Sequence, residues 1–193
     1  MSLPLSRAEA WDLFCSWTAS ESLRRHVLAV ELCMRAYARR FGEDEESWGL
    51  VGMLHDLDYE RYPDLETGHP RMALEELRKQ GFSEEFVRAV ASHADFLEVS
   101  RDSPMEKTLF AVDELSGFVM ACAFVRPEGI HGMTPKSVKK KMKTPAFAAA
   151  VNRDELREGA EKLGVDFDEH VTLVIAALEE RAGELGLEGR AAA

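Results

Sequence analysis

The chain has 193 residues, of which 24 are Lys or Arg and 35 are Asp or Glu, so its formal net charge at pH 7 is −11. Apolar residues make up 46% and charged residues 31%, a balance typical of a globular protein and not of a disordered one. The acidity argues against general binding to nucleic acids or anionic membranes.

The sequence shows no mark of a membrane or secreted protein. Its longest apolar run, Phe118 to Val125, is far shorter than the roughly 20 residues of a membrane helix. The start, MSLPLSRAEAW, lacks the basic and apolar regions of a signal peptide. Cys15, Cys33 and Cys122 are odd in number and widely spaced, which indicates free thiols in a reducing compartment. We therefore expect a cytoplasmic protein with no membrane partner.

Apolar residues recur three or four positions apart along almost the whole chain, which predicts helices. Ser6, Ser83 and Pro104 are typical of helix starts, whereas Gly42 and Gly81 are typical of helix ends. In chain order we expect helices over about 6–18, 21–40, 44–56, 70–81, 83–96 and 104–125, a short basic helix after 135, and helices over 153–163 and 167–185. No segment alternates convincingly between apolar and polar residues. The prediction is an all-α fold in a single domain over 1–193, a bundle of about eight or nine helices.

Several polar side chains occupy positions that the helical pattern turns toward the core. His26 and His93 lie on the apolar stripes of their helices, and Asp113 lies among apolar residues. His55 and Asp56 come where the chain leaves the core for a loop. A buried carboxylate is very unfavourable without a compensating positive charge, and no Lys or Arg lies one helical turn from either Asp on the inward face. A divalent metal ion is the simplest partner, and this donor set suits Mn, Fe, Zn, Co, Ni or Mg.

Each of these residues also has an ordinary interpretation. A histidine on an apolar stripe is more often a hydrogen-bonded core residue than a metal ligand. His69, which precedes Pro70, fits a simple turn. His131 and His170 lack an inward polar setting and are expected to be surface or structural residues. Four of the six histidines together with two inward carboxylates are nevertheless hard to obtain by chance.

The order His26, His55-Asp56, Asp113 resembles the HD superfamily of metal-dependent phosphohydrolases, which is named for its adjacent His-Asp pair. The resemblance implies an HD-type helical domain, with its core at about 21–125 and a C-terminal helical extension at about 126–185. It also implies that these four residues are ligands of one metal ion.

Some members of the superfamily hold a second ion with two further histidines, and His69 and His93 stand where those are expected. The stretches GMLHDLDYE, MEKTLFAVDELSGF, CAFVRP and SVKKKMKTPAFAAAVNRDEL are similar to a bacterial subgroup of predicted HD hydrolases without a known substrate. The resemblance therefore covers nearly the whole chain.

The activity implied by the resemblance is hydrolysis of a phosphoester of a nucleotide or a related small phosphorylated metabolite. The nucleophile would be water activated by one or two divalent ions. Asp56 is the catalytic candidate that would bridge two ions. Asp58 is a candidate for orienting a ligand or accepting a proton, although an exposed loop acid is its ordinary interpretation.

A basic segment stands out in this acidic chain. Between Arg126 and Arg153 seven residues are Lys or Arg and one is acidic. Such a segment fits either a solvated face or a site for a phosphate-bearing molecule. The candidates for binding the phosphate of a substrate, each of which could also be a solvent-exposed charge, are Arg25, Lys136, Lys139 and Lys140. RNA binding has little support, because the segment lacks interleaved aromatic residues.

Two other functions stay open at this point. A His/Asp cluster that binds two irons on the same scaffold can perform oxygenase chemistry, as a few HD-domain relatives do. The domain could also bind a metal and a nucleotide without catalysis and signal by association, although the intact ligand set argues against this. The expected partner is a small phosphorylated molecule, and association into a homo-oligomer stays open.

Overall fold

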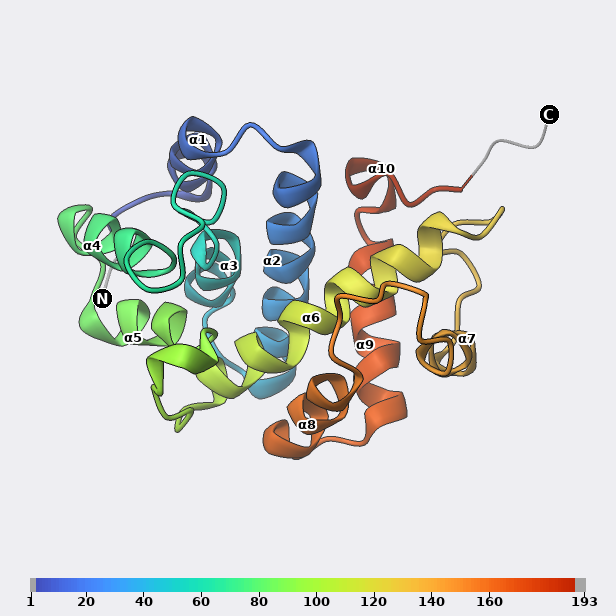
Figure 1. Ribbon diagram of the computed structural model, residues 1–193. Coiled ribbons are helices and arrows are strands. Elements are labelled where there is room, and N and C mark those ends of the chain that lie inside the picture. Colours follow the sequence, from blue (N-terminus) through green and yellow to red (C-terminus); the bar gives the residue numbers. More distant parts are fainter. Residues whose placement is uncertain (1–2, 190–193) are drawn as a thin grey trace.

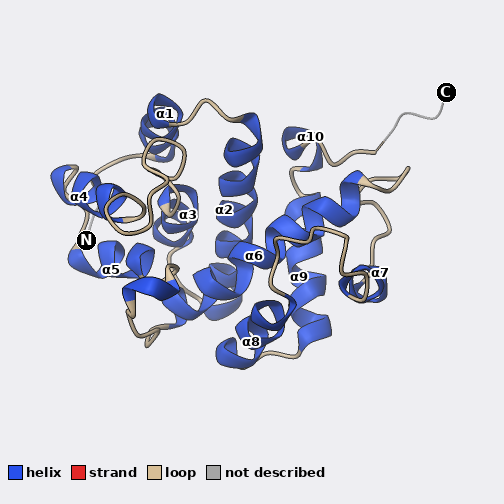
Figure 2. Ribbon diagram, viewed as in Figure 1, coloured by secondary structure: helices blue, strands red, loops and turns tan. Residues whose placement is uncertain are grey.

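The computed structural model describes residues 3–189, and every regular element in this range is a helix (Figures 1 and 2). The elements are α1 (Arg7–Trp17), α2 (Glu21–Phe41), α3 (Glu45–Leu54), α4 (Arg71–Lys79), α5 (Glu84–Ala91), the 3-10 helix η1 (Asp95–Leu97), α6 (Pro104–Phe124), α7 (Pro135–Met142), α8 (Arg153–Leu163), α9 (Phe167–Glu179) and α10 (Ala182–Leu185). The all-α prediction is confirmed. The structure has one α-helix more than expected, because Arg181 leaves the helical conformation and divides the last predicted helix into α9 and α10.

Hydrogen-bonded caps determine where the helices begin. At the start of α1, Ser6 accepts the amide of Glu9, and the Glu9 carboxylate accepts the amide of Ser6. Ser103 and Glu106 form the same reciprocal pair at the start of α6. These capping boxes satisfy amides that have no partner within the helix.

Two helices end earlier than the sequence predicts. We expected α3 to reach Asp56 and α5 to reach about Phe96, but they end at Leu54 and Ala91. In both cases a histidine just after the helix donates a hydrogen bond from its ring to a carbonyl of the last turn, and the chain then leaves the helix.

The two longest helices, α2 and α6, pack against each other in the middle of the molecule (Figure 1). Helices α1, α3, α4 and α5 lie on one side of α2, and α7 to α10 lie on the other. Helix α3 lies very close to α2 at Gly52, where an added Cβ would be 3.0 Å from the backbone nitrogen of Glu31. Within residues 3–189, no helix has both the length and the apolar character needed to cross a membrane.

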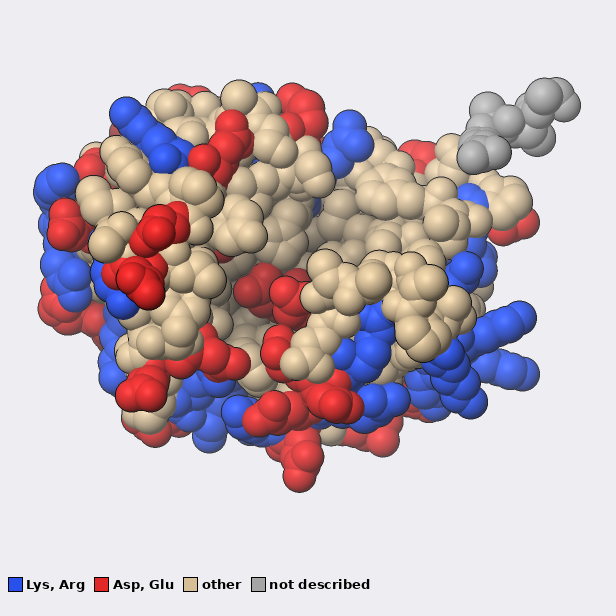
Figure 3. All heavy atoms as spheres, in the orientation of Figure 1, with Lys and Arg blue, Asp and Glu red and all other residues tan. Residues whose placement is uncertain are grey.

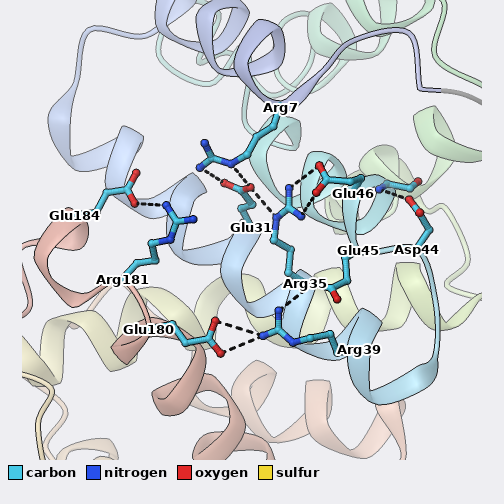
Figure 4. A network of polar contacts seen from close by, with 11 residues as sticks. Arg7, Glu31, Arg35, Arg39, Asp44, Glu45, Glu46, Glu180, Arg181 and Glu184 are labelled. Atoms are coloured by element: carbon cyan, nitrogen blue, oxygen red, sulfur yellow. Dashed lines mark hydrogen bonds and ion pairs between the residues drawn. The ribbon is translucent and has the colours of Figure 1, made fainter.

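A buried carboxylate, Glu31 of α2, joins three helices through arginines (Figure 4). Glu31 is 1% exposed. Arg7 of α1 donates to it from Nε at 2.7 Å and from Nη2 at 2.9 Å, and Arg35 of α2 donates from Nε at 2.9 Å. Arg35 also donates two hydrogen bonds to Glu46 of α3, at 2.7 and 3.0 Å. These charge-assisted bonds therefore connect α1, α2 and α3.

Replacing Glu31 with Gln should lower the free energy of unfolding by about 3 kcal/mol, because it leaves Arg7 without a carboxylate and Arg35 with that of Glu46 alone. The matched control is Glu45→Gln, which breaks the exposed pair with Arg39 and should cost less than about 1 kcal/mol. Urea unfolding followed by circular dichroism measures both values. Equal losses in the two variants would contradict the structural role of Glu31.

Candidate metal centre

The six residues that the sequence singled out as metal ligands come together in one cluster. His26 comes from α2 and Asp113 from α6, whereas the remaining four, His55, Asp56, His69 and His93, lie in turns that follow α3, precede α4 and follow α5. In the cluster, Nε2 of His26 is 3.1 Å from Oδ1 of Asp113, and Nε2 of His55 is 3.4 Å from the same oxygen. Two helices and two connecting segments, one between α3 and α4 and one after α5, thus supply one polar centre.

The two oxygens of Asp56 face two different groups of imidazoles. Its Oδ2 is 3.5 Å from Nε2 of His55 and 3.8 Å from Nε2 of His26. Its Oδ1 is 3.6 Å from Nε2 of His93 and 3.7 Å from Nε2 of His69. Ligand atoms that share one ion at about 2.1 Å lie about 3.0–3.4 Å apart, so the observed spacings are close to those of coordinating atoms. Each group could hold one ion, with Asp56 common to both.

Hydrogen bonds on the far side of the rings determine which nitrogen faces the cluster. Nδ1 of His55 donates to the carbonyl of Gly52 at 2.7 Å, and Nδ1 of His93 donates to the carbonyl of Val90 at 2.6 Å. Because a carbonyl only accepts, Nδ1 carries the proton, and the neutral ring presents a lone pair at Nε2. Proteins orient metal-binding imidazoles in this way.

Asp58 lies behind His69 and does not line the open face of the cluster. It is fully buried. Its Oδ1 accepts a hydrogen bond from Nδ1 of His69 at 2.8 Å, and its Oδ2 accepts the amide of Ala73 at 2.7 Å. Since both oxygens are occupied, the structure favours an orienting role for Asp58 over proton transfer to or from a substrate. The interpretation of Asp58 as an exposed loop acid is wrong.

Two features of the imidazole nitrogens indicate that the cluster needs a cation. Nε2 of His55 is buried and has no hydrogen-bond partner within residues 3–189. Nε2 of His69 and Nε2 of His93 face each other at 3.2 Å, although both rings direct their Nδ1 protons elsewhere. Two facing lone pairs repel each other unless a cation, either a proton or a metal ion, lies with them. The donor set therefore fits a divalent ion.

The pKa values of His55, Asp56 and Asp113 in the chain without metal also indicate that the cluster needs a cation. Burial disfavours a charge on His55, but the carboxylates of Asp56 and Asp113 outweigh it and raise the pKa of His55 to about 10. Burial also opposes the ionised forms of both carboxyls, but the nearby imidazolium outweighs it and holds the pKa of each below its usual range. A proton on His55 thus occupies a place where the charge of a metal ion could replace it.

The cluster opens into a cavity of about 1080 Å³. Much of the wall is apolar, with Leu23, Leu65, Phe96, Phe110, Met120 and Phe124 among its residues. The wall also carries carboxylates, and acidic side chains gather around a hollow near the middle of the face in Figure 3. The cavity provides room for a substrate directly above the cluster.

Sequence reasoning missed several polar residues of this cavity, among them Tyr59, Glu114 and Glu155. The ring of Tyr59 contacts His69 edge-on, with 5.1 Å between the centroids. The side chain of Glu114 is exposed to the cavity, where the surrounding wall and then the charge of Asp113 raise its pKa to about 7. A second acid directly after Asp113 in an apolar helix was the available signal for Glu114.

The structure does not bring the predicted phosphate-binding residues to the cluster. Lys136 and Lys140 line a separate cavity of about 460 Å³, and Lys139 pairs with a carboxylate of α9 at 2.7 Å. Arg25 lies beside the turn that ends α10. None of the four belongs to the wall of the cavity above the cluster. The chain turns back after α6, and α7 packs against α6 and α9 at the edge of the molecule, away from the cluster (Figure 1).

The two remaining histidines lie outside the cluster. His170 is buried, where its ring contacts the hydroxyl of Tyr37 at 2.5 Å and the carbonyl of Ala111 at 3.0 Å. His131 is exposed and pairs with two glutamates. Their expected structural and surface settings are confirmed.

If each group of ligands binds one ion, His69→Ala or His93→Ala should lower the metal content from about two ions per chain to about one. Each change removes one of the three donor atoms of the second group, which are Oδ1 of Asp56 and the Nε2 atoms of His69 and His93. Elemental analysis of the manganese-loaded protein measures the content, and circular dichroism checks the fold. His131→Ala is the matched control and should keep the wild-type content. Unchanged content in both cluster variants would show that these histidines hold no ion.

Metal binding should release about one proton per chain at about pH 8, because His55 must lose its proton to become a ligand. The pKa of His55 lies above its ordinary value of 6.5, at about 10, so the proton is bound at this pH and metal affinity should rise as the pH rises toward 10. Calorimetric titration in two buffers of different ionisation enthalpy measures the released proton. A value of zero would contradict the assigned electrostatics.

Comparison with known proteins agrees with this geometry. Residues 23–117, which contain all six cluster residues, match the family model described as HD domain. A ribonuclease Y from Rhodopirellula baltica is 26% identical over 121 residues, which are 63% of this chain and 22% of that protein. The chain thus matches about a fifth of the ribonuclease, and no solved structure matches it. Residues 23–117 of the chain therefore form an HD domain.

Proposed function

We propose that this protein hydrolyses a small phosphoester with water activated by divalent metal ions at the His/Asp cluster. The observation that carries the proposal is the orientation of His55, His69 and His93. Each ring directs its Nδ1 proton to an acceptor on the far side and its Nε2 toward Asp56, at 3.5 to 3.7 Å. Three rings fixed in this way around one carboxylate support metal binding far better than they support a packed core.

The proposed ligands form two sets that share Asp56. One ion would be held by His26, His55, Asp56 and Asp113, and a second by Asp56, His69 and His93. A bound divalent ion lowers the pKa of its water from about 16 toward 7 and withdraws charge from a phosphoryl oxygen. The donors suit Mn, Fe, Co, Ni, Zn or Mg.

The chain's own residues supply orientation and shape. Asp58 holds the ring of His69 and is itself held by the amide of Ala73. The carbonyls of Gly52 and Val90 hold the other two rings. The apolar part of the cavity wall provides a surface for the organic part of a substrate.

The direct test is metal analysis of the purified protein, followed by a phosphoester panel assayed with several added divalent ions. Release of phosphate that stops on chelation and returns with metal supports the proposal. A protein that contains iron and consumes dioxygen with its substrate would instead be an oxygenase. A protein that binds metal and nucleotide but cleaves nothing would be a binding module.

Asp56→Asn should lower the turnover of a cleaved phosphoester about a thousandfold, which corresponds to about 4 kcal/mol in the barrier, because Asp56 is shared by both ligand sets. The fold should survive, since the change keeps the size of the side chain. Glu66→Gln, an exposed position in the segment between α3 and α4, is the matched control and should keep wild-type turnover. If Asp56→Asn retains more than about a tenth of the turnover, a loss below about 1.4 kcal/mol, the cluster is not the catalytic centre.

A further inference from the structure

The cavity above the cluster collects most of the large apolar side chains that the described chain exposes. Tyr59, Leu65, Phe96 and Phe124 are between 44% and 49% exposed, and all four line this cavity. Exposed apolar side chains gathered in one place mark a binding surface, whereas single ones need no explanation. The wall is therefore suited to a ligand with a substantial apolar or aromatic body.

The charge of the wall limits which phosphorylated ligands it can accept. Among the described residues that line the cavity there is no Lys or Arg, and there are six carboxylates. Arg101 lies close by, over the ring of Phe110 at 3.7 Å, but its guanidinium is bound to Asp95. A triphosphate or a polynucleotide carries several negative charges and is normally bound by Lys and Arg side chains, which this wall does not offer.

Three of the six carboxylates have no partner of opposite charge, and one of the three, Glu60, is held by the backbone amides of Ala19 and Ser20. Asp56 and Asp113 belong to the cluster, and Asp95 pairs with Arg101. Glu114 of α6 and Glu155 of α8 form no ion pair within residues 3–189. The side-chain amide of Asn152 donates to Glu155 at 2.6 Å. The three cations of α8 bind elsewhere: Arg153 donates to backbone carbonyls, Arg157 pairs with Asp154, and Lys162 pairs with Glu158 while its Nζ lies 4.9 Å from the ring centroid of Phe110. The cavity thus presents two uncompensated carboxylates beside an apolar wall.

We propose that the substrate is a phosphomonoester with a single phosphate on an apolar or aromatic body that carries an amino group. The phosphate would lie at the cluster, the body would pack on the aromatic wall, and the ammonium would face Glu114 and Glu155. This inference rests on the proposed function for the place of the phosphate. The preference for a cationic body rests on the wall alone.

Three aryl phosphates with similar leaving groups test the preference: tyramine O-phosphate, 4-ethylphenyl phosphate, and the O-phosphate of 3-(4-hydroxyphenyl)propionate. At about pH 8 the amine is still protonated. We expect kcat/KM to fall in that order, with about tenfold or more between the first and the last. ATP and a short single-stranded RNA should be cleaved more slowly than 4-ethylphenyl phosphate.

Glu155→Gln separates the effect of charge from the effect of shape. It should lower the ratio of kcat/KM for tyramine O-phosphate over 4-ethylphenyl phosphate by about threefold, because Glu114 still faces the ammonium. The matched control is Glu158→Gln on the same helix, which does not line the cavity and should keep the wild-type ratio. A ratio unchanged by Glu155→Gln, or faster cleavage of ATP, RNA or the carboxylate compound, overturns the inference.

A binding measurement distinguishes failure of this inference from failure of the proposed function. Tyramine and 4-ethylphenol carry no phosphate, so their dissociation constants for the metal-loaded full chain report on the wall alone. We expect tyramine to bind about tenfold more tightly, and Glu155→Gln to reduce this difference by about threefold. If this holds while no phosphoester is cleaved, the proposed function fails and the cationic preference stands. If phosphoesters are cleaved while the two phenols bind equally, the inference is overturned and the proposed function stands.

Discussion

The structure depends on one electrostatic constraint, the convergence of two carboxylates and the ring nitrogens of four histidines at a largely buried point. Such a group is stable only when a cation shares the space, because facing lone pairs and adjacent carboxylates repel one another. Without metal, a proton on His55 supplies part of this positive charge, because the carboxylates of Asp56 and Asp113 raise the pKa of His55 to about 10. The carbonyl and carboxylate acceptors behind the rings matter for the same reason: they keep the lone pairs pointed at the centre when rotation would relieve the repulsion.

Helix packing holds this arrangement in place, and Gly52 contributes both to the packing of α3 on α2 and to the orientation of His55. The absence of a side chain at Gly52 lets α3 lie against the backbone of α2, where an added Cβ would be 3.0 Å from the nitrogen of Glu31. The carbonyl of the same residue accepts the ring proton of His55. The distance between the two helices and the direction of a cluster imidazole are therefore set at one position. The arginines on Glu31 connect α1 and α3 to the same stretch of α2, so buried charge supports the packing on which the cluster depends.

Much of the fold and of the cluster could be predicted from the sequence, because both follow from local patterns. Helical spacing and capping residues such as Ser6 and Ser103 specify the helices, and an inward Asp113 without a nearby cation indicates a metal. What could not be predicted depends on tertiary contacts. The burial of Asp58 requires the amide of α4 to be placed beside it, and the position of Glu155 requires α8 to pack on α6. The lysines of α7 line a separate cavity, and the basic composition of this segment did not indicate how far from the cluster it would lie.

The separation of the basic segment from the cavity changes how the centre must work. Had those lysines surrounded the cluster, side chains would attract the phosphate and the ions would serve the chemistry alone. In the described structure the wall carries carboxylates and neither Lys nor Arg, so under the proposed function the positive charge that a phosphate meets there would have to come from bound ions. Loading with metal would then be a condition for binding substrate as well as for activating water. The same acidic wall becomes an advantage once the ions are present, because it repels molecules whose negative charge exceeds what the two ions can balance.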